Sequence, residues 1–256
     1  MSHRVPARSG WDWIKQGFGL FRKQPGVLTA LLFINLMITV VLGEIPHVGP
    51  LLGVVLIPSL SMATMQACAF IAQDQRVRLS VLATGFRKPA VIALCKLGLI
   101  YMGISLLLTL VMQLSVDPNF WVQLAAPFDP KVGPKVNPSD VFVIFGINLL
   151  GALVALSLCF AAPLAAWQGM NTGKATFYSF FAVVGAVRAF IVMLMAWFAM
   201  LVFVLTIVVT VLGRSEASQV VLTWVGLMLV LLLQCALFAA YRQIFGAPTD
   251  TVATPA

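Results

Sequence analysis

Residues 187–212, VRAFIVMLMAWFAMLVFVLTIVVTVL, form a continuous apolar run whose one charged side chain, Arg188, lies near its start. A helix rises about 1.5 Å per residue, so this run is roughly 39 Å long and crosses the ~30 Å hydrocarbon core of a bilayer when tilted. A transmembrane β-barrel would instead show stretches of about ten residues with alternating polarity. The run therefore predicts a membrane-spanning helix.

Five further runs of the same kind occur along the chain. The six predicted spans are 26–43, 50–72, 91–113, 141–167, 187–212 and 219–241. Apolar residues make up 61% of the 256 residues and charged residues only 9%, whereas soluble domains carry about 25% charged residues. Backbone polar groups in lipid must be satisfied inside helices or closed barrels. The predicted fold class is all-α: a polytopic transmembrane helical bundle of about six spans, with amphipathic interfacial helices.

The net charge of +8 is distributed unevenly among the segments that connect these spans. Most Lys and Arg residues lie in the N-terminal segment and in the loops after the second and fourth spans. The opposite loops carry only Lys131, Lys135 and Arg214. Because basic loops stay in the cytoplasm, this pattern predicts a multi-pass membrane protein with both termini in the cytoplasm.

Three segments follow from this topology. They are a cytoplasmic N-terminal segment with an interfacial helix (1–25), a six-helix transmembrane domain (26–241) and a cytoplasmic C-terminal tail (242–256). The polar and amphipathic residues before the first span do not resemble a cleavable signal peptide. We therefore expect the first span to be a retained anchor.

Residues 10–24, GWDWIKQGFGLFRKQ, predict an interfacial helix ahead of the first span. Aromatic and cationic side chains at helical spacing suit the headgroup layer of a membrane. Such a helix either orients the first span or senses lipid or a protein partner. The segments 74–90 and 168–186 have a similar pattern. The residues expected to anchor the first of these helices are Trp11, Trp13, Phe18, Arg22 and Lys23.

Stripes of small residues mark the second and fourth spans. Helices in lipid associate through close packing of such residues rather than through a hydrophobic driving force. In the second span Ser59, Ala63 and Ala67 repeat every four residues, and in the fourth a longer stripe runs from Asn148 to Ala162. We therefore expect these two spans to be central, and the fifth and sixth to face lipid.

Both of these spans also contain a proline, Pro58 or Pro163, which removes a helical hydrogen bond and kinks the helix. The fourth span could break at Pro163. Such kinks line the sites of some transporters, but they also occur in inert bundles, where neighbours satisfy the freed backbone groups. The four cysteines all lie within predicted spans without CxxC spacing, and we interpret them as small packing residues.

Four polar side chains inside the spans are candidates for ligand contacts. Hydrogen bonds between helices are the simpler explanation for the uncharged ones, and a substrate pathway is the alternative. The lysine lies only about 9 Å from the start of its helix, so its ammonium group can reach the interface by snorkelling. The alternative is a functional charge within the membrane. The four candidates are Asn35, Gln66, Lys96 and Asn148.

Patterns typical of catalysis or metal binding are not found in the sequence. The two histidines, His3 and His47, lie outside the predicted spans, and there is no HExxH motif, Cys/His cluster or Gly-rich phosphate loop. The basic residues lie beside helix ends, which indicates a membrane surface rather than nucleic acid as their partner. We therefore expect no enzymatic activity, no cofactor, no metal and no nucleic acid.

Three stretches carry a family resemblance. They are GWDWIKQGFGLFRKQP at 10–25, IPHVGPLL at 45–52 with Pro58 following, and AAPLAAWQGMNTGKATFYSFFAVVGAVRAF at 161–190. The pattern, which extends to the fifth span, resembles a family of uncharacterised multi-pass inner-membrane proteins of proteobacteria. The resemblance implies an inner-membrane location and a helical bundle, and it implies no activity for any residue.

The sequence thus favours a non-enzymatic inner-membrane protein that acts through membrane lipids or a membrane-protein partner. The interfacial helix at 10–24 would be its contact surface. The alternative is a small-molecule or lipid transporter or channel that uses the polar faces of the second and fourth spans. A hydrated cavity reaching Gln66 or Asn148 would support the alternative, and a dry centre would count against it.

Overall fold

The computed structural model describes residues 5–86, 90–118, 120–121, 137–213 and 215–248. Within these residues the fold is all-α and contains no strand, and six helical segments are long and apolar enough to cross a membrane. This agrees with the predicted fold class and with the six predicted spans. The elements are α1 (Ser9–Lys23), α2 (Pro25–Gly43), α3 (Val48–Ala72), the 3₁₀-helix η1 (Leu79–Phe86), α4 (Ala90–Ser115), α6 (Pro138–Ser157), α7 (Ala161–Trp167), α8 (Thr172–Gly185), α9 (Val187–Leu212) and α10 (Glu216–Phe245).

The helices begin where the sequence supplies suitable capping residues. Helix α2 starts at Pro25, whose missing N–H costs nothing in the first helical turn. Asn137 caps α6, because its side-chain oxygen accepts a hydrogen bond of 3.3 Å from the Ser139 N–H. Ser215 and Ser218 form a reciprocal capping box at the start of α10. Local capping chemistry therefore accounts for these helix boundaries.

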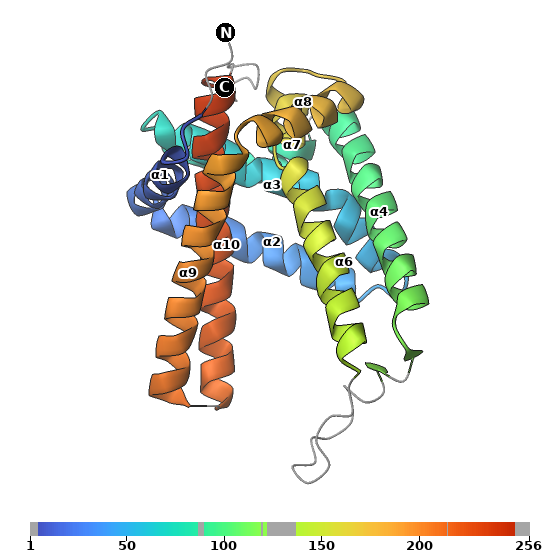
Figure 1. Ribbon diagram of the computed structural model, residues 1–256. Coiled ribbons are helices and arrows are strands. Elements are labelled where there is room, and N and C mark those ends of the chain that lie inside the picture. Colours follow the sequence, from blue (N-terminus) through green and yellow to red (C-terminus); the bar gives the residue numbers. More distant parts are fainter. Residues whose placement is uncertain (1–4, 87–89, 119, 122–136, 214, 249–256) are drawn as a thin grey trace.

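Two pairs of long helices, α4 with α6 and α9 with α10, stand upright in Figure 1, and α2 and α3 cross between them. Helix α3 joins the two pairs because it contacts both α4 and α10. The shorter elements α1, η1, α7 and α8 gather at one end of the molecule, which we name the terminal end because the first helix, α1, and the last turns of α10 lie there.

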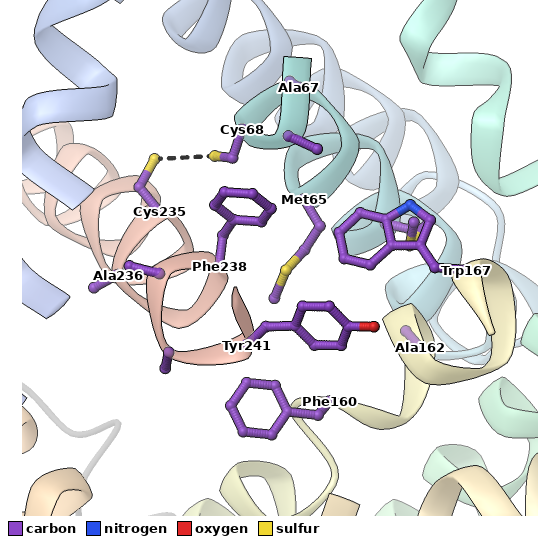
Figure 2. Packing of buried hydrophobic residues seen from close by; sticks show 14 of the residues in the cluster. Met65, Ala67, Cys68, Phe160, Ala162, Trp167, Cys235, Ala236, Phe238 and Tyr241 are labelled. Atoms are coloured by element: carbon purple, nitrogen blue, oxygen red, sulfur yellow. Dashed lines mark hydrogen bonds between the residues drawn. The ribbon is translucent and has the colours of Figure 1, made fainter. Parts of the chain in front are cut away.

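The hydrophobic core lies at this terminal end. It contains the second half of α3, the last turns of α10, helix α7 and the inner face of α1. Aromatic rings fill its centre: the Trp167 and Tyr241 rings are 4.9 Å apart, and the rings of Phe160 and Tyr241 are 6.1 Å apart. Figure 2 shows the rings of Trp167, Tyr241 and Phe238 around Met65, with the Phe160 ring beyond that of Tyr241. Offset and tilted aromatic contacts of this kind stabilise a core beyond the area that they bury.

The predicted central position of the second span is confirmed by α3, because 67% of its most apolar stretch is buried. Two glycines from other elements allow this. A Cβ atom on Gly98 of α4 would collide with the Val55 carbonyl oxygen, and one on Gly85 of η1 would collide with that of Ser59. Both contacts flank Pro58, so the proline of this helix lies within close packing rather than at an open site.

The predicted central position of the fourth span is wrong for most of its length, since only 6% of its most apolar stretch is buried. The span breaks after Ser157, and only the short α7 that follows enters the core. Ser179 of α8 stabilises the break. Its hydroxyl accepts a hydrogen bond of 3.1 Å from the Phe160 N–H and donates one of 2.7 Å to the Ser157 carbonyl. The break therefore comes before Pro163, at a point that α8 supports.

The prediction for the sixth span needs a correction as well. The first half of α10 exposes apolar side chains, as expected for a lipid-facing helix, but its last turns are buried in the core from Leu231 to Tyr241. The fifth span, α9, is mostly exposed, and only Ala189, Phe190 and Met193 near its start are buried. A uniformly apolar sequence does not show which half of such a helix meets lipid and which meets protein.

Charge is divided between the two ends of the described structure. The terminal end carries basic side chains from α1, from the segment after α3, and from α8, α9 and α10. This end also carries Asp12 of α1 and Asp74 after α3, whereas Glu44, Asp117, Asp140 and Glu216 lie at the other ends of α2, α4, α6 and α10. Lys131, Lys135 and Arg214, which also bear on the predicted orientation, lie outside the described residues. The basic residues of the terminal end include Arg8, Lys15, Arg22, Lys23, Arg76, Arg78, Lys174, Arg188 and Arg242.

Candidate functional site

The inner face of α1 is fixed to the bundle by two glycines and a tryptophan. A Cβ atom on Gly10 would collide with the Ala189 carbonyl oxygen of α9, and one on Gly17 would lie 2.6 Å from the Ala236 nitrogen of α10. Between these two points Trp13 is fully buried. Because neither glycine has a side chain, α1 approaches both helices at backbone distance.

Trp13 is therefore not the membrane-surface anchor that the sequence predicted. Its indole N–H donates a hydrogen bond of 2.5 Å to the Gln243 side-chain oxygen, and the Gln243 amide donates one of 3.2 Å to the Ser9 hydroxyl. Its ring meets that of Phe190 edge-on at 5.3 Å. The close approach of α1 to α9 and α10 moves this side chain from the headgroup layer into the protein core.

The outer face of α1 is exposed and alternates aromatic with cationic residues. At 100° per residue, Trp11, Lys15, Phe18 and Arg22 lie within about 60° of one line along the helix. Trp11 is 46% exposed and Phe18 50% exposed. The Lys15 ammonium group lies 5.6 Å from the centre of the Trp11 ring, within range of a cation–π contact. This face has the composition that suits a membrane interface.

The end of α1 is attached to the segment that follows α3. Lys23, also predicted as an anchor, forms a 2.6 Å ion pair with Asp74, although both side chains are largely exposed. Gln24 adds two bonds: its amide donates to the Gln75 carbonyl at 2.7 Å, and its oxygen accepts from the Val77 N–H at 3.2 Å. An exposed ion pair contributes little by itself, so the glutamine contacts are the firmer attachment. The Lys23 charge is thus compensated, in contrast to the outer face.

An apolar groove of about 280 Å³ lies between α1, α9 and α10. We name it the α1 groove. Its one charged lining residue is Lys15. The remaining wall residues are Trp11, Ile14, Phe18, Trp197, Met200, Leu232, Leu233 and Ala236. The sequence identified the α1 part of this wall but not the part from α9 and α10, because apolar residues in apolar spans give no signal of their own.

A second groove, of about 430 Å³, lies between α4 and α6. Polar side chains of Tyr101, Ser105, Thr109 and Asn148 occur along it. Two of these side chains form hydrogen bonds within their own helices. The Thr109 hydroxyl donates to the Ser105 carbonyl at 2.8 Å, and the Asn148 side-chain amide donates to the Ile144 carbonyl at 2.8 Å. The small residues of the fourth span, Gly151 included, thus line a groove instead of closing a helix interface.

The structure does not bring the four ligand candidates together. Asn148 lines the α4–α6 groove, whereas Lys96 is exposed on α4 and is not among the residues that line that groove. Gln66 is buried in the core, and its oxygen accepts a hydrogen bond of 2.6 Å from the indole N–H of Trp167. Asn35 lies on α2, and its buried oxygen has no hydrogen-bond partner among the described residues. The two polar faces proposed for a transport pathway are therefore separate.

The cysteines occur where packing residues are expected. Cys68 of α3 and Cys235 of α10 are fully buried, and their sulfur atoms lie 3.5 Å apart (Figure 2). Both are free thiols, as are Cys95 and Cys159. The contact between the first pair lies at the point where α3 meets the last turns of α10.

Helix α8 provides another exposed aromatic surface at the terminal end. Phe177 and Phe181 are 61% and 53% exposed, and their ring centres are 4.5 Å apart. Tyr178, Phe180 and Val184 are exposed beside them. The amphipathic pattern at 168–186 predicted part of this face. In the segment 74–90, η1 buries Val81 and exposes Phe86, while the side chain of Leu79 lies outside the description.

Comparison with known proteins supports the sequence resemblance. The chain is 28% identical to a protein of Burkholderia thailandensis named a probable inner membrane protein, and the match covers 94% of this chain and 93% of that protein. No family model matches the chain, and no solved structure matches it. The similarity confirms the resemblance to inner-membrane proteins of proteobacteria, and the name of the relative gives no activity.

Proposed function

We infer that this chain is a non-enzymatic inner-membrane protein that acts through membrane lipid, with α1 as its contact with the cytoplasmic leaflet. The supporting observation is the two-sidedness of α1. Gly10, Trp13 and Gly17 fix one face to α9 and α10 at backbone distance, while the opposite face exposes Trp11 and Phe18. A helix held rigidly in this way presents its aromatic and cationic side chains in one fixed position.

The cytoplasmic assignment of the terminal end is part of this proposal. The described basic residues other than Lys96 gather at this end, where Asp12 and Asp74 are the acidic ones, and this excess of positive charge is the distribution of the positive-inside rule. The exposed aromatic face of α8 would meet the same leaflet. The proposal involves no catalysis, cofactor or nucleic acid.

The cytoplasmic assignment can be tested with the variant Arg78→Cys and a thiol reagent that does not cross membranes. The reagent should label the new cysteine in inverted vesicles but not in intact cells, and labelling from the periplasm would refute the assignment.

Lipid retention tests the proposal directly. The full chain would be purified from nanodiscs, and its bound lipids counted by quantitative mass spectrometry. Replacing both Trp11 and Phe18 with alanine should reduce the retained lipid at least twofold, because the headgroup-layer contacts of α1 are removed. Alanine at Phe142 and Phe145 is the matched control, since these aromatic residues are exposed on α6. Equal lipid retention by the two folded variants would refute the proposal, and so would loss of a protein partner without loss of lipid.

The α4–α6 groove supports a second candidate, a small-molecule or lipid transporter. Its volume of about 430 Å³ and its line of hydroxyl and amide groups resemble a ligand site. This candidate involves Asn148 but not Gln66, because the Gln66 side-chain oxygen accepts the Trp167 indole N–H in the buried core. Substrate-flux measurements in proteoliposomes should then change when Asn148 becomes leucine and stay constant when Gln219, near the start of α10, becomes leucine.

A further inference from the structure

We propose that the α1 groove binds one acyl chain of an anionic phospholipid, with the phosphate of that lipid held at Lys15. This inference rests on the proposed function, because it specifies the lipid and the site where α1 makes its contact. The argument has three parts: the lining of the groove, its size, and the charge at its edge.

The lining of the α1 groove excludes water-soluble ligands. Apart from Lys15, its walls are aromatic and aliphatic side chains from three helices. Of the two wall tryptophans, Trp197 donates its indole N–H to the Leu229 carbonyl at 3.0 Å and so offers no donor to a ligand, and Trp11 lies at the exposed edge beside Lys15. Water in such a groove would find few hydrogen-bond partners, so an apolar chain is the favoured occupant.

The size of the groove is compatible with part of one acyl chain. At about 280 Å³ it is smaller than the roughly 300–1,000 Å³ of pockets that hold drug-sized ligands. Its shape is set by rigid contacts, because α1 meets α10 at Gly17 and Ala236 and meets α9 at Gly10. The groove is therefore preformed and needs no closure around its occupant.

The charge at the edge of the groove selects the headgroup. Lys15 lines the groove beside Trp11, and Arg22 lies two helical turns further along the same face of α1. Neither cation forms an ion pair among the described residues, whereas Lys23 is engaged with Asp74. An acyl chain in the groove would carry its phosphate to this cationic edge, where a lysine near a membrane surface favours anionic lipid.

The test uses the full chain in nanodiscs that contain equal amounts of phosphatidylglycerol and phosphatidylcholine. After extraction into detergent, native mass spectrometry should show one phosphatidylglycerol retained per protomer in preference to phosphatidylcholine. Lys15→Gln should lower this preference about fivefold, the effect of one lysine near a lipid surface. Lys15→Arg should preserve it. A preference that survives Lys15→Gln would overturn the headgroup assignment.

A second pair of variants tests the acyl chain. Met200→Trp should fill the groove and abolish the retained phosphatidylglycerol. Met195→Trp is the matched control, because Met195 lies on the same helix, is 68% exposed and does not line the groove. If Met200→Trp keeps the lipid while alanine at Trp11 and Phe18 still reduces total lipid, the groove is not the site and the proposed function stands. A dimer that Met200→Trp converts to a monomer would also overturn the inference, since a second copy would then cover this face.

Discussion

Helices α3 and α6 have similar sequence patterns, but α3 is largely buried in the protein and α6 is largely exposed. Both are apolar, both carry a stripe of small residues, and both contain one uncharged amide, Gln66 or Asn148. Yet 67% of the most apolar stretch of α3 is buried, compared with 6% for the fourth span, to which α6 belongs. A stripe of small residues permits another helix to approach closely, but burial also requires that a neighbouring helix lie against the stripe.

The partners of the two helices account for the difference. Helix α3 is approached by Gly85 and Gly98, which lie on other elements and have no side chain to separate the backbones. On α6, an added Cβ at Gly151 would meet only the tip of the Leu108 side chain, at 3.3 Å, and one at Gly146 would meet nothing within 4 Å. Close packing in lipid thus depends on small residues on both surfaces.

The largest expected effect comes from blocking the approach to α3. Gly98→Leu should destabilise the protein by about 3 kcal/mol, at the upper end for overpacking, because the new side chain meets the Val55 backbone. Leucine is a good helix former, so the loss would not reflect helix propensity. The measurement is the free energy of unfolding from a titration with a denaturing detergent. Gly103→Leu, on the same helix with open space around it, should cost less than about 0.5 kcal/mol. Equal costs at both positions would show that α3 is not held by this contact.

Replacing the side-chain amides of Gln66 and Asn148 should give a smaller difference in the free energy of unfolding. Gln66→Leu removes the acceptor of the Trp167 indole N–H in the core and should cost about 2 kcal/mol of unfolding free energy. Asn148→Leu removes a bond within one exposed helix and should cost no more than about 0.6 kcal/mol. The same detergent titration measures both values. A larger cost for Asn148→Leu would mean that the α4–α6 groove is closed by a partner in the membrane.

The sequence predicted the features that one helix determines by itself. Apolar runs predicted the six spans, and the pattern at 10–24 predicted α1. The sequence could not predict features that depend on two or more helices. Trp13 is an example: its aromatic side chain in an amphipathic segment predicts a membrane-surface anchor. Its burial instead results from the close approach of Gly10 and Gly17 to backbone atoms of α9 and α10, which the sequence of one helix does not reveal. The groove residues Trp197 and Met200 were missed for the same reason, since a lipid-facing residue and a groove-lining residue have the same apolar character.

A smaller loss of stability than at Gly98 or Gln66 is expected at the break that separates α6 from α7. Ser179→Ala should cost about 1 kcal/mol of unfolding free energy, because the Phe160 N–H and the Ser157 carbonyl both lose the hydroxyl that links them. Ser157→Ala is the control, since the Ser157 hydroxyl donates to the Val154 carbonyl of its own helix, and it should cost less than about 0.5 kcal/mol. The detergent titration distinguishes the two variants. If Ser179→Ala costs nothing, the chain breaks at this point without help from α8, and the exposure of α6 then follows from the local sequence at 158–160 rather than from tertiary support.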